Sequence, residues 1–143
     1  GNELIFIDPN TLTITGSVAI DTYAGAITYN EKYDCYAISR GGKTLEILNS
    51  DFEIIKTYTR TDKTGYTAQG MGSDDNYLYF PMSYQDKKNV IVVYDWYGNY
   101  IMTIQSDVTR EAESMFWVNG KYYFAHNYYL EGMNVWEGTF KIS

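Results

Sequence analysis

Residues 68–80, AQGMGSDDNYLYF, recur 44 residues later as residues 112–124, AESMFWVNGKYYF. In both copies a segment that begins with Ala and carries Met is followed by a turn and then by a short aromatic run that ends in Phe. A related segment, Gly25–Asn30, begins 44 residues before Gln69. Self-similarity at a fixed spacing of this size is typical of repeat architectures, in which each repeat is one supersecondary unit.

The pattern within each unit is that of β-strands. Short runs rich in Val, Ile, Tyr, Phe and Thr are bounded by turn residues. No amphipathic stretch of helical period extends beyond about two turns. Four strands in about 40–45 residues make up one blade of a β-propeller. We therefore predict an all-β chain with strands at about residues 4–8, 13–19, 25–30, 35–40, 44–48, 53–60, 69–74, 77–83, 90–95, 100–106, 113–118, 121–127 and 137–142.

Small residues set the order of the strands within each blade. Gly70, Gly72 and Ser114 fall in runs that we assign to the innermost strand, where blades converge on the axis and space is tight. The whole chain, 1–143, is then one propeller segment of four-stranded antiparallel blades that does not close a ring of about 4–8 blades. It comprises a partial blade at 1–20, complete blades at 25–60 and 69–106, and a partial blade at 113–143.

An incomplete ring leaves apolar faces uncovered, and three arrangements would cover them. Further blades precede residue 1, several copies of the chain assemble into a homo-oligomeric ring, or the units stack as an open β-array. The chain begins with Gly1 rather than Met, which leads us to expect a segment upstream.

Charge and composition exclude several classes of partner. The formal net charge of −7 disfavours nucleic acid and anionic membrane surfaces, because binding to phosphate needs a basic footprint. No apolar run approaches the ~20 residues that a membrane-spanning helix needs, so we predict no membrane insertion. The single cysteine, Cys35, permits no internal disulfide, and its place in an apolar strand predicts a buried thiol.

The predicted meander divides the loops between two rims of the disc. The connections between blades (21–24, 61–68 and 107–112) share one rim with those between second and third strands (40–43, 84–89 and 128–134). The other rim has only tight turns. Long polar loops on a rigid scaffold are where recognition usually resides, so we predict that the long-loop rim is the functional face.

Two polar side chains stand at equivalent repeat positions on that rim. Gln69 and Glu113 begin their innermost strands, near the mouth of the central channel. They could bind a polar ligand or Ca²⁺, which takes amide and carboxylate oxygens. They could equally hydrogen-bond neighbouring blades. A metal-assisted hydrolase or lyase with Glu113, Gln69 and one of Asp62 or Asp107 at the channel is the catalytic alternative. No cofactor is predicted otherwise.

Aromatic residues on the same rim suggest a binding surface. Tyr66, Tyr84 and Tyr128 lie among amides and the guanidinium of Arg110, a mixture that suits sugar faces and also peptide anchors. The only histidine, His126, is either a ligand contact or a structural residue. Lys87 and Lys88 are interpreted as a solvated pair.

The residues resemble bacterial β-propellers of the YVTN, NHL and helveticin-like type. The resemblance rests on Ala68–Met71 with Asn76–Phe80, on their copies at 112–115 and 120–124, and on Ile91–Asp95 followed by Gly98–Ile101. It covers essentially the whole chain, whereas the Gly-His and Trp-Asp signatures of WD40 repeats are absent. The resemblance implies that this protein is extracellular or located at the cell surface.

Together these observations predict a binding module rather than a catalyst. The expected ligand is a glycan or other polar surface ligand on the long-loop rim, held by Tyr66, Gln69, Tyr84, Arg110, Glu113, His126 and Tyr128. A scaffold for protein–protein interaction is the further alternative.

Overall fold

The computed structural model describes residues 2–20, 23–40, 42–84, 87–127 and 132–139, which form four antiparallel sheets without a helix. Among these residues, no helix is therefore available to cross a membrane. The first sheet is a hairpin of β1 (Asn2–Ile7) and β2 (Ile14–Ile20). A second sheet has the order β3 (Ala26–Asn30), β4 (Cys35–Ser39), β5 (Thr44–Asn49) and β6 (Ile54–Thr59).

The other two sheets follow the same plan. In the third sheet, β9 (Tyr77–Ser83) pairs with two short strands, β7 (Thr67–Ala68) and β8 (Gly72–Ser73), and β10 (Val90–Asp95) and β11 (Tyr100–Gln105) follow outward. The fourth sheet is β12 (Glu111–Val118), β13 (Lys121–Asn127) and β14 (Met133–Gly138). We call the sheets blades 1 to 4 in chain order.

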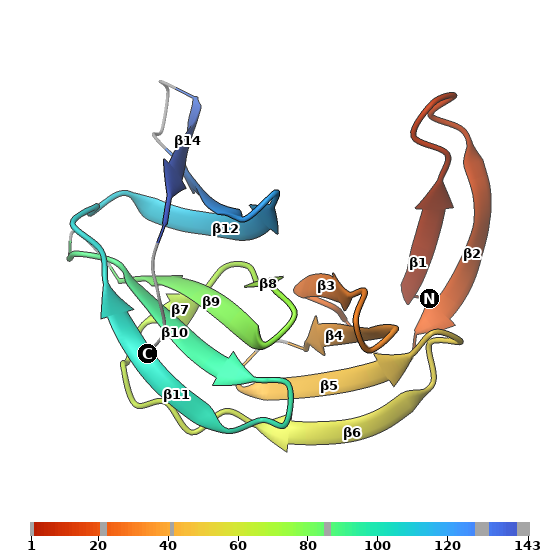
Figure 1. Ribbon diagram of the computed structural model, residues 1–143, viewed down its shortest axis with the longest axis horizontal. Coiled ribbons are helices and arrows are strands. Elements are labelled where there is room, and N and C mark those ends of the chain that lie inside the picture. Colours follow the sequence, from red (N-terminus) through yellow and green to blue (C-terminus); the bar gives the residue numbers. More distant parts are fainter. Residues whose placement is uncertain (1, 21–22, 41, 85–86, 128–131, 140–143) are drawn as a thin grey trace.

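The blades lie along an open arc (Figure 1). The strands β3, β8 and β12 are on its inner side, and β6 and β11 are on its outer side. The opening lies between blade 4 and the β1–β2 hairpin. The predicted all-β class, the antiparallel blades and the incomplete ring of two full and two partial blades are therefore confirmed.

Two strand predictions differ from the structure. The run 69–74 is not one strand, because residues 69–71 leave the ladder between β7 and β8. The same repeat position is irregular in blade 4, where the register shifts between Ala112 and Ser114. Such a bulge bends an inner strand around the axis. The last strand is Met133–Gly138 rather than 137–142, and residues 140–142 lie outside the described part.

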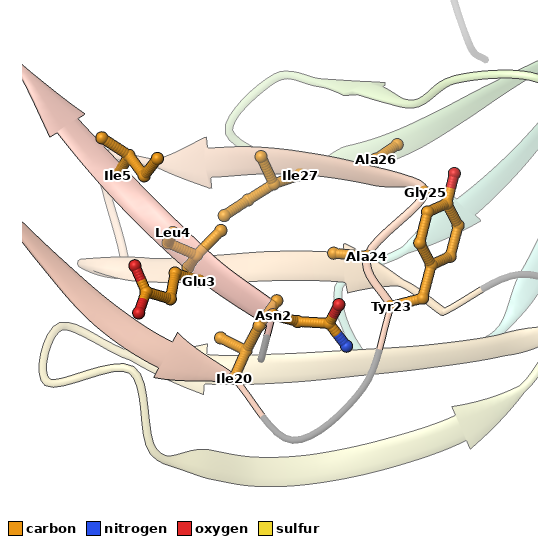
Figure 2. A pocket seen from close by; sticks show the side chains of 10 residues that line it. All are labelled: Asn2, Glu3, Leu4, Ile5, Ile20, Tyr23, Ala24, Gly25, Ala26 and Ile27. Carbon is orange, nitrogen blue, oxygen red and sulfur yellow. The ribbon is translucent and has the colours of Figure 1, made fainter.

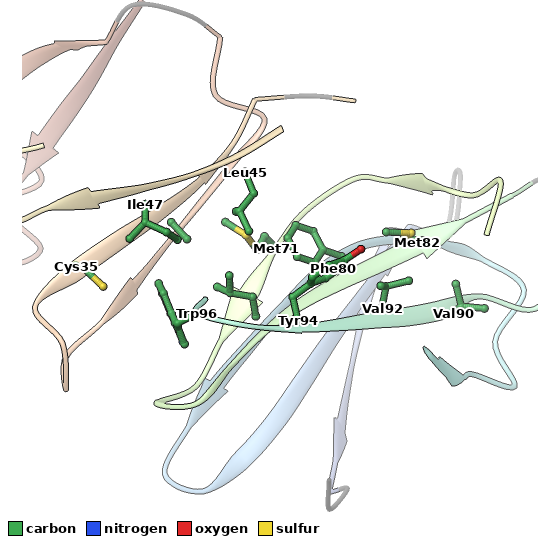
Figure 3. Close-up of a cluster of buried hydrophobic side chains, with 12 residues drawn as sticks. Cys35, Leu45, Ile47, Met71, Phe80, Met82, Val90, Val92, Tyr94 and Trp96 are labelled. Atoms are coloured by element: carbon green, nitrogen blue, oxygen red, sulfur yellow. The ribbon is translucent and has the colours of Figure 1, made fainter. Parts of the chain in front are cut away.

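Blade 3 is buried on both faces, because successive side chains of its central strands β9 and β10 pack alternately against blade 2 and blade 4. Even-numbered side chains such as Phe80 and Val92 point to blade 2, where they join Leu45 and Ile47 in the larger core (Figure 3). Odd-numbered ones such as Tyr79 point to blade 4, in a smaller core with Ile91, Val93 and Met115. Successive side chains of a strand face opposite ways, so the near-continuous apolar runs 78–82 and 90–94 serve two interfaces. Cys35 is a buried free thiol in the larger core, as predicted.

Glycines permit close approach of the inner strands of blades 3 and 4. A Cβ added at Gly72 would lie 2.1 Å from the carbonyl oxygen of Met115, and one at Gly70 would lie 2.3 Å from that of Glu113. These contacts are with backbone atoms, which cannot rotate away. The two positions therefore need glycine for space alone.

The side chain of Asp74 joins blades 3 and 4 at the rim that carries the tight turns. Both Tyr79 and Tyr122 donate hydroxyl hydrogen bonds to Oδ2 of Asp74, over 2.6 and 2.5 Å. The other oxygen, Oδ1, accepts the backbone N–H groups of Asn76 and Tyr77. Burial first, and then the bond to Asp74, raise the pKa of Tyr122 to about 12, and the same causes raise that of Tyr79. The hydrogen bonds from these two neutral phenols to Asp74 link blade 4 to blade 3.

The space inside the β1–β2 hairpin is open. A cavity of about 530 Å³ lies between β1 and β3, with Leu4, Ile5, Tyr23 and Ile27 among its walls (Figure 2). The hairpin contacts blade 2 through the rings of Phe6 and Phe52, whose centroids are 5.4 Å apart. A complete four-stranded blade would have two further strands on the inner side of the β1–β2 hairpin, where this cavity lies.

We expect Gly72→Ala to lower the free energy of unfolding by about 1–3 kcal/mol or more, because the new methyl meets a backbone carbonyl. Gly25→Ala is the matched control, since its Cβ would be at an ordinary 3.5 Å from Ser39 O. Urea denaturation of both variants checks this. Equal loss of stability in the two would contradict the close-approach argument.

We expect the stability of the protein to fall between about pH 10 and pH 12. The raised pKa of Tyr122 means that the folded state holds its proton more tightly than the unfolded state, whose pKa is near 10. The contribution is therefore complete below pH 10 and is lost as pH rises through about 12. Tyr122→Phe should make the fall of unfolding free energy with pH shallower in this window. An unchanged slope would show that the Asp74 cluster does not retain the proton.

Candidate functional site

The antiparallel pairing places four of the six predicted long loops at one rim, and residues 21–22 and 128–131 of the other two lie outside the described residues. The partners Ser39↔Ala26, Thr59↔Thr44 and Gln105↔Val90 bring the ends of β4, β6 and β11 to the edge at which the inner strands begin. The loops 40–43, 60–66, 84–89 and 106–110 follow there, with 41 and 85–86 outside the described residues. We keep the name long-loop rim for this edge and call the opposite edge the tight-turn rim.

Tyr66 and Tyr84 come together on this rim, and we call them the tyrosine pair. The pairing of Thr67 with Ser83 brings them close, and their ring centroids are 5.7 Å apart with a 47° tilt. Tyr84 is 43% exposed, whereas Tyr66 is half-buried against the larger core. The ammonium of Lys87 lies 4.5 Å from the centroid of the Tyr84 ring. Two sequence-predicted residues thus form an exposed aromatic surface with a cation beside it.

Gln69 and Glu113 have different surroundings. The amide of Gln69 donates a 2.6 Å hydrogen bond to Oε1 of Glu111, in the blade that follows. Glu113 is half-buried at the bulge of β12, where its carbonyl faces Gly70. Across the described residues, no group of three or more His, Cys, Asp or Glu side chains is placed to hold a metal ion. The calcium site at the channel stays a prediction.

The remaining predicted residues are dispersed. Arg110 is exposed on the rim, and its backbone carbonyl accepts a hydrogen bond from the amide of Asn89. Tyr128 lies outside the described residues. His126 is buried, with 4% of its surface exposed, and burial lowers its pKa. It faces the interface between blades 3 and 4 and does not belong to the exposed surface around the tyrosine pair.

An ionic group that the sequence did not reveal lies at the rim between blades 2 and 3, with Arg60 and Asp62 buried and Lys43 half-exposed. We call Lys43, Arg60, Asp62 and Tyr94 the connector cluster. The hydroxyl of Tyr94 donates to Oδ1 of Asp62 over 3.0 Å and accepts the N–H groups of residues 61 and 62 over 2.8 Å. Arg60 Nη1 and Lys43 Nζ lie 3.6 and 3.7 Å from the Asp62 carboxylate.

The guanidinium of Arg60 is held inside the interface. It lies 4.4 Å from the centroid of the Phe80 ring, and Nη2 donates to the carbonyl of Gly42 over 2.8 Å. Burial lowers the pKa of Arg60, against the opposing effect of the Asp62 charge. Asp62, a candidate metal ligand in the sequence, therefore has two cations of its own chain beside it.

Asp107, the other candidate carboxylate, is in an exposed ion pair. Lys88 Nζ lies 2.6 Å from its Oδ1, and the side chain of Asp107 is 95% exposed. This hydrogen bond lowers the pKa of Asp107. Lys88 therefore has a carboxylate partner and Lys87 an aromatic one, although both are exposed as predicted.

Comparisons with known proteins support the fold. No protein-family model matches the sequence, and no curated protein matches it. Among solved structures, the chain is similar to Sqt1 of Saccharomyces cerevisiae, with 12% identity and a TM-score of 0.52 over 95% of this chain and 38% of that one. It is also similar to the Cps50 (Swd1) beta-propeller domain of Myceliophteria thermophila, with 14% identity and a TM-score of 0.50 over 88% and 35%.

A chain in the structure titled Mitotic Checkpoint Complex matches with 12% identity and a TM-score of 0.52, over 86% of this chain and 34% of that one. The protein thus spans little more than a third of the length of these chains. At such low identity the likeness shows the β-propeller fold, to which the sequence assigned the chain.

We expect Asp62→Ala to destabilise the protein by about 3–5 kcal/mol, because it leaves buried Arg60 without its carboxylate. Asp107→Ala is the control, since its exposed ion pair is screened by water and its loss should leave the unfolding transition unchanged. Thermal and urea unfolding of both variants test the difference. A small effect of Asp62→Ala would mean that the connector cluster does not stabilise the interface.

Proposed function

We propose that this protein is a non-catalytic recognition module of a β-propeller and that its long-loop rim binds a segment of an extracellular or cell-surface glycan. The observation that carries the proposal is the tyrosine pair, in which an exposed ring and a half-buried ring meet at 5.7 Å on the rim. The half-buried Tyr66 is anchored in the core, so the pair is held by the scaffold. Rigid aromatic surfaces lose little conformational entropy on binding.

The polar groups of the long-loop rim suit a ligand rich in hydroxyls. The ammonium of Lys87 can donate hydrogen bonds, and the carboxylate of Glu111 can accept them. The phenol hydroxyls of Tyr66 and Tyr84 can do both. The apolar faces of a sugar ring stack on aromatic side chains, while its edges need polar partners of this kind.

A protein partner is the second candidate. Exposed tyrosines are enriched in protein interfaces as well, and the rim offers both a cation and carboxylates for a polar border. One of the similar solved structures is titled as a complex, which supports this alternative at the level of the fold. The two candidates share the tyrosine pair and differ in the ligand that occupies it.

We expect the protein to bind members of a polysaccharide panel and Tyr84→Ala to weaken that binding at least tenfold. Tyr97→Ala is the matched control. Tyr97 is 62% exposed and has the ammonium of Lys56 at 5.6 Å from its ring, but it lies on the tight-turn rim. Affinity electrophoresis followed by calorimetry on the strongest ligand measures both variants.

The outcomes separate the candidates. Loss of binding in Tyr84→Ala with retention in Tyr97→Ala supports the glycan proposal. Absence of binding across the panel, together with Tyr84-dependent selection of peptides from a displayed library, would replace it with the protein candidate. Equal losses in both variants would show adsorption to exposed aromatic rings and would reject the tyrosine pair as a site.

A further inference from the structure

A second cavity lies between blades 3 and 4, away from the tyrosine pair. It has a volume of about 250 Å³. Blade 3 and the connection after it supply Ile91, Ile104 and Val108, and blade 4 supplies Phe124 and Trp136. The polar members of its wall are Gln105, Ser106 and His126. The cavity continues the smaller core, in which Phe124 and Ile104 also take part.

The equivalent space between blades 2 and 3 is filled. There the ring of Tyr94 is fully buried at 5.8 Å from the ring of Phe80, and the guanidinium of Arg60 covers the same phenylalanine. Phe124 stands 44 residues after Phe80. One interface of the repeat is thus packed with a phenol and a guanidinium, and the next is hollow.

The strand register shows which side chain is missing. Tyr94 pairs with Leu78 in blade 3, and Gly138 pairs with Tyr122 in blade 4, so that both partners are displaced by the same 44 residues. Gly138 therefore occupies the repeat position of Tyr94. A Cβ added at Gly138 would meet Phe124 at 3.5 Å, an ordinary contact. The backbone therefore leaves room for a Cβ at this position.

The polar partners of that phenol are replaced as well. Ile104 stands 44 residues after Arg60, and Ser106 stands 44 residues after Asp62. Three of the four residues of the connector cluster are therefore replaced at the second interface, whereas the equivalent of Lys43 is Lys87, whose ammonium lies over the ring of Tyr84. The counterparts of both Arg60 and Asp62 are uncharged. The apolar walls of the cavity are therefore not left beside an unpaired charge.

The surroundings of His126 differ from those of its repeat equivalent. It occupies the repeat position of Met82, whose sulfur accepts a hydrogen bond from the hydroxyl of Thr64. The residue equivalent to Thr64 is Val108, which has no hydroxyl. Within the described residues, Nδ1 of His126 is buried without a hydrogen-bond partner. An unsatisfied buried nitrogen is unfavourable, so a ligand hydroxyl that drew this nitrogen to the cavity wall and satisfied it would gain affinity. Burial lowers the pKa of His126 and so favours the neutral ring, which can donate at one nitrogen and accept at the other.

We propose that this cavity binds a small phenol, with its ring between Phe124, Trp136 and the isoleucines and its hydroxyl toward His126 and Ser106. The ligand would take the place that the Tyr94 side chain fills in the preceding interface. A dry apolar cavity of about 150 Å³ can hold benzene, whereas drug-sized ligands need about 300 Å³ or more. The volume of about 250 Å³ suits one substituted aromatic ring. A hydroxyl both donates and accepts, so it can pair with either tautomer of His126.

The test uses 4-methylphenol, which has the chemistry of a tyrosine side chain, and toluene as its counterpart without the hydroxyl. Calorimetric titration of the wild-type chain should give saturable binding of 4-methylphenol at least tenfold tighter than that of toluene. Gly138→Tyr restores the missing side chain and should weaken 4-methylphenol binding at least tenfold while raising the melting temperature. His126→Phe should keep an aromatic wall and abolish the preference for 4-methylphenol over toluene.

Further arms keep the proposal falsifiable if Gly138→Tyr does not fold. Val108→Phe fills the cavity from the opposite wall and should also weaken binding, whereas Tyr84→Ala should leave it unchanged. Absence of saturable 4-methylphenol binding by the wild type, or unchanged binding in both filling variants, would overturn the proposal. Binding of the peptide Gly-Tyr-Gly in place of 4-methylphenol would also overturn it, because the phenol would then come from a protein segment.

Discussion

The close approach of the inner strands is the constraint on which the arc depends. Where Gly72 faces the carbonyl of Met115, there is no room for a single methyl group. Between blades 2 and 3 the inner strands are joined differently, by the 2.7 Å hydrogen bond between the hydroxyls of Thr28 and Ser73. Small residues bring the blades near enough for their broad apolar faces to meet farther out. The two cores on either side of blade 3 exist because of this spacing.

The repeat made much of the architecture predictable. Because Gly70 and Ser114 mark equivalent inner positions, the strands could be ordered from the sequence, and the order gave two full and two partial blades. The interruption at 69–71 could not be predicted, since a bulge depends on how an inner strand must bend toward its neighbour. The last strand was misplaced because Met133–Gly138 lacks the alternation that a half-buried strand shows.

The candidate site was predictable only in part. Tyr66 and Tyr84 could be placed on one rim, but their contact depends on the pairing of Thr67 with Ser83. The connector cluster was missed because Asp62 and Tyr94 are 32 residues apart in sequence and carry no motif. The signal for the second cavity was present in the sequence, as Gly138 in place of Tyr94. It could be interpreted only once the register had shown which residues of the two interfaces correspond.

The arc also implies that resistance to local opening differs along the chain. Each blade contacts only its neighbours, so stability is approximately a sum of blade and interface contributions. The interface of blades 2 and 3 holds the larger core and the connector cluster, whereas the β1–β2 hairpin is attached through the Phe6–Phe52 contact beside an open cavity. Amide hydrogens of β9 and β10 would then exchange last and those of the hairpin first. The free energy of local opening is thus highest in the central blades and falls toward both ends of the arc. A ligand bound at one interface need not raise it at the other.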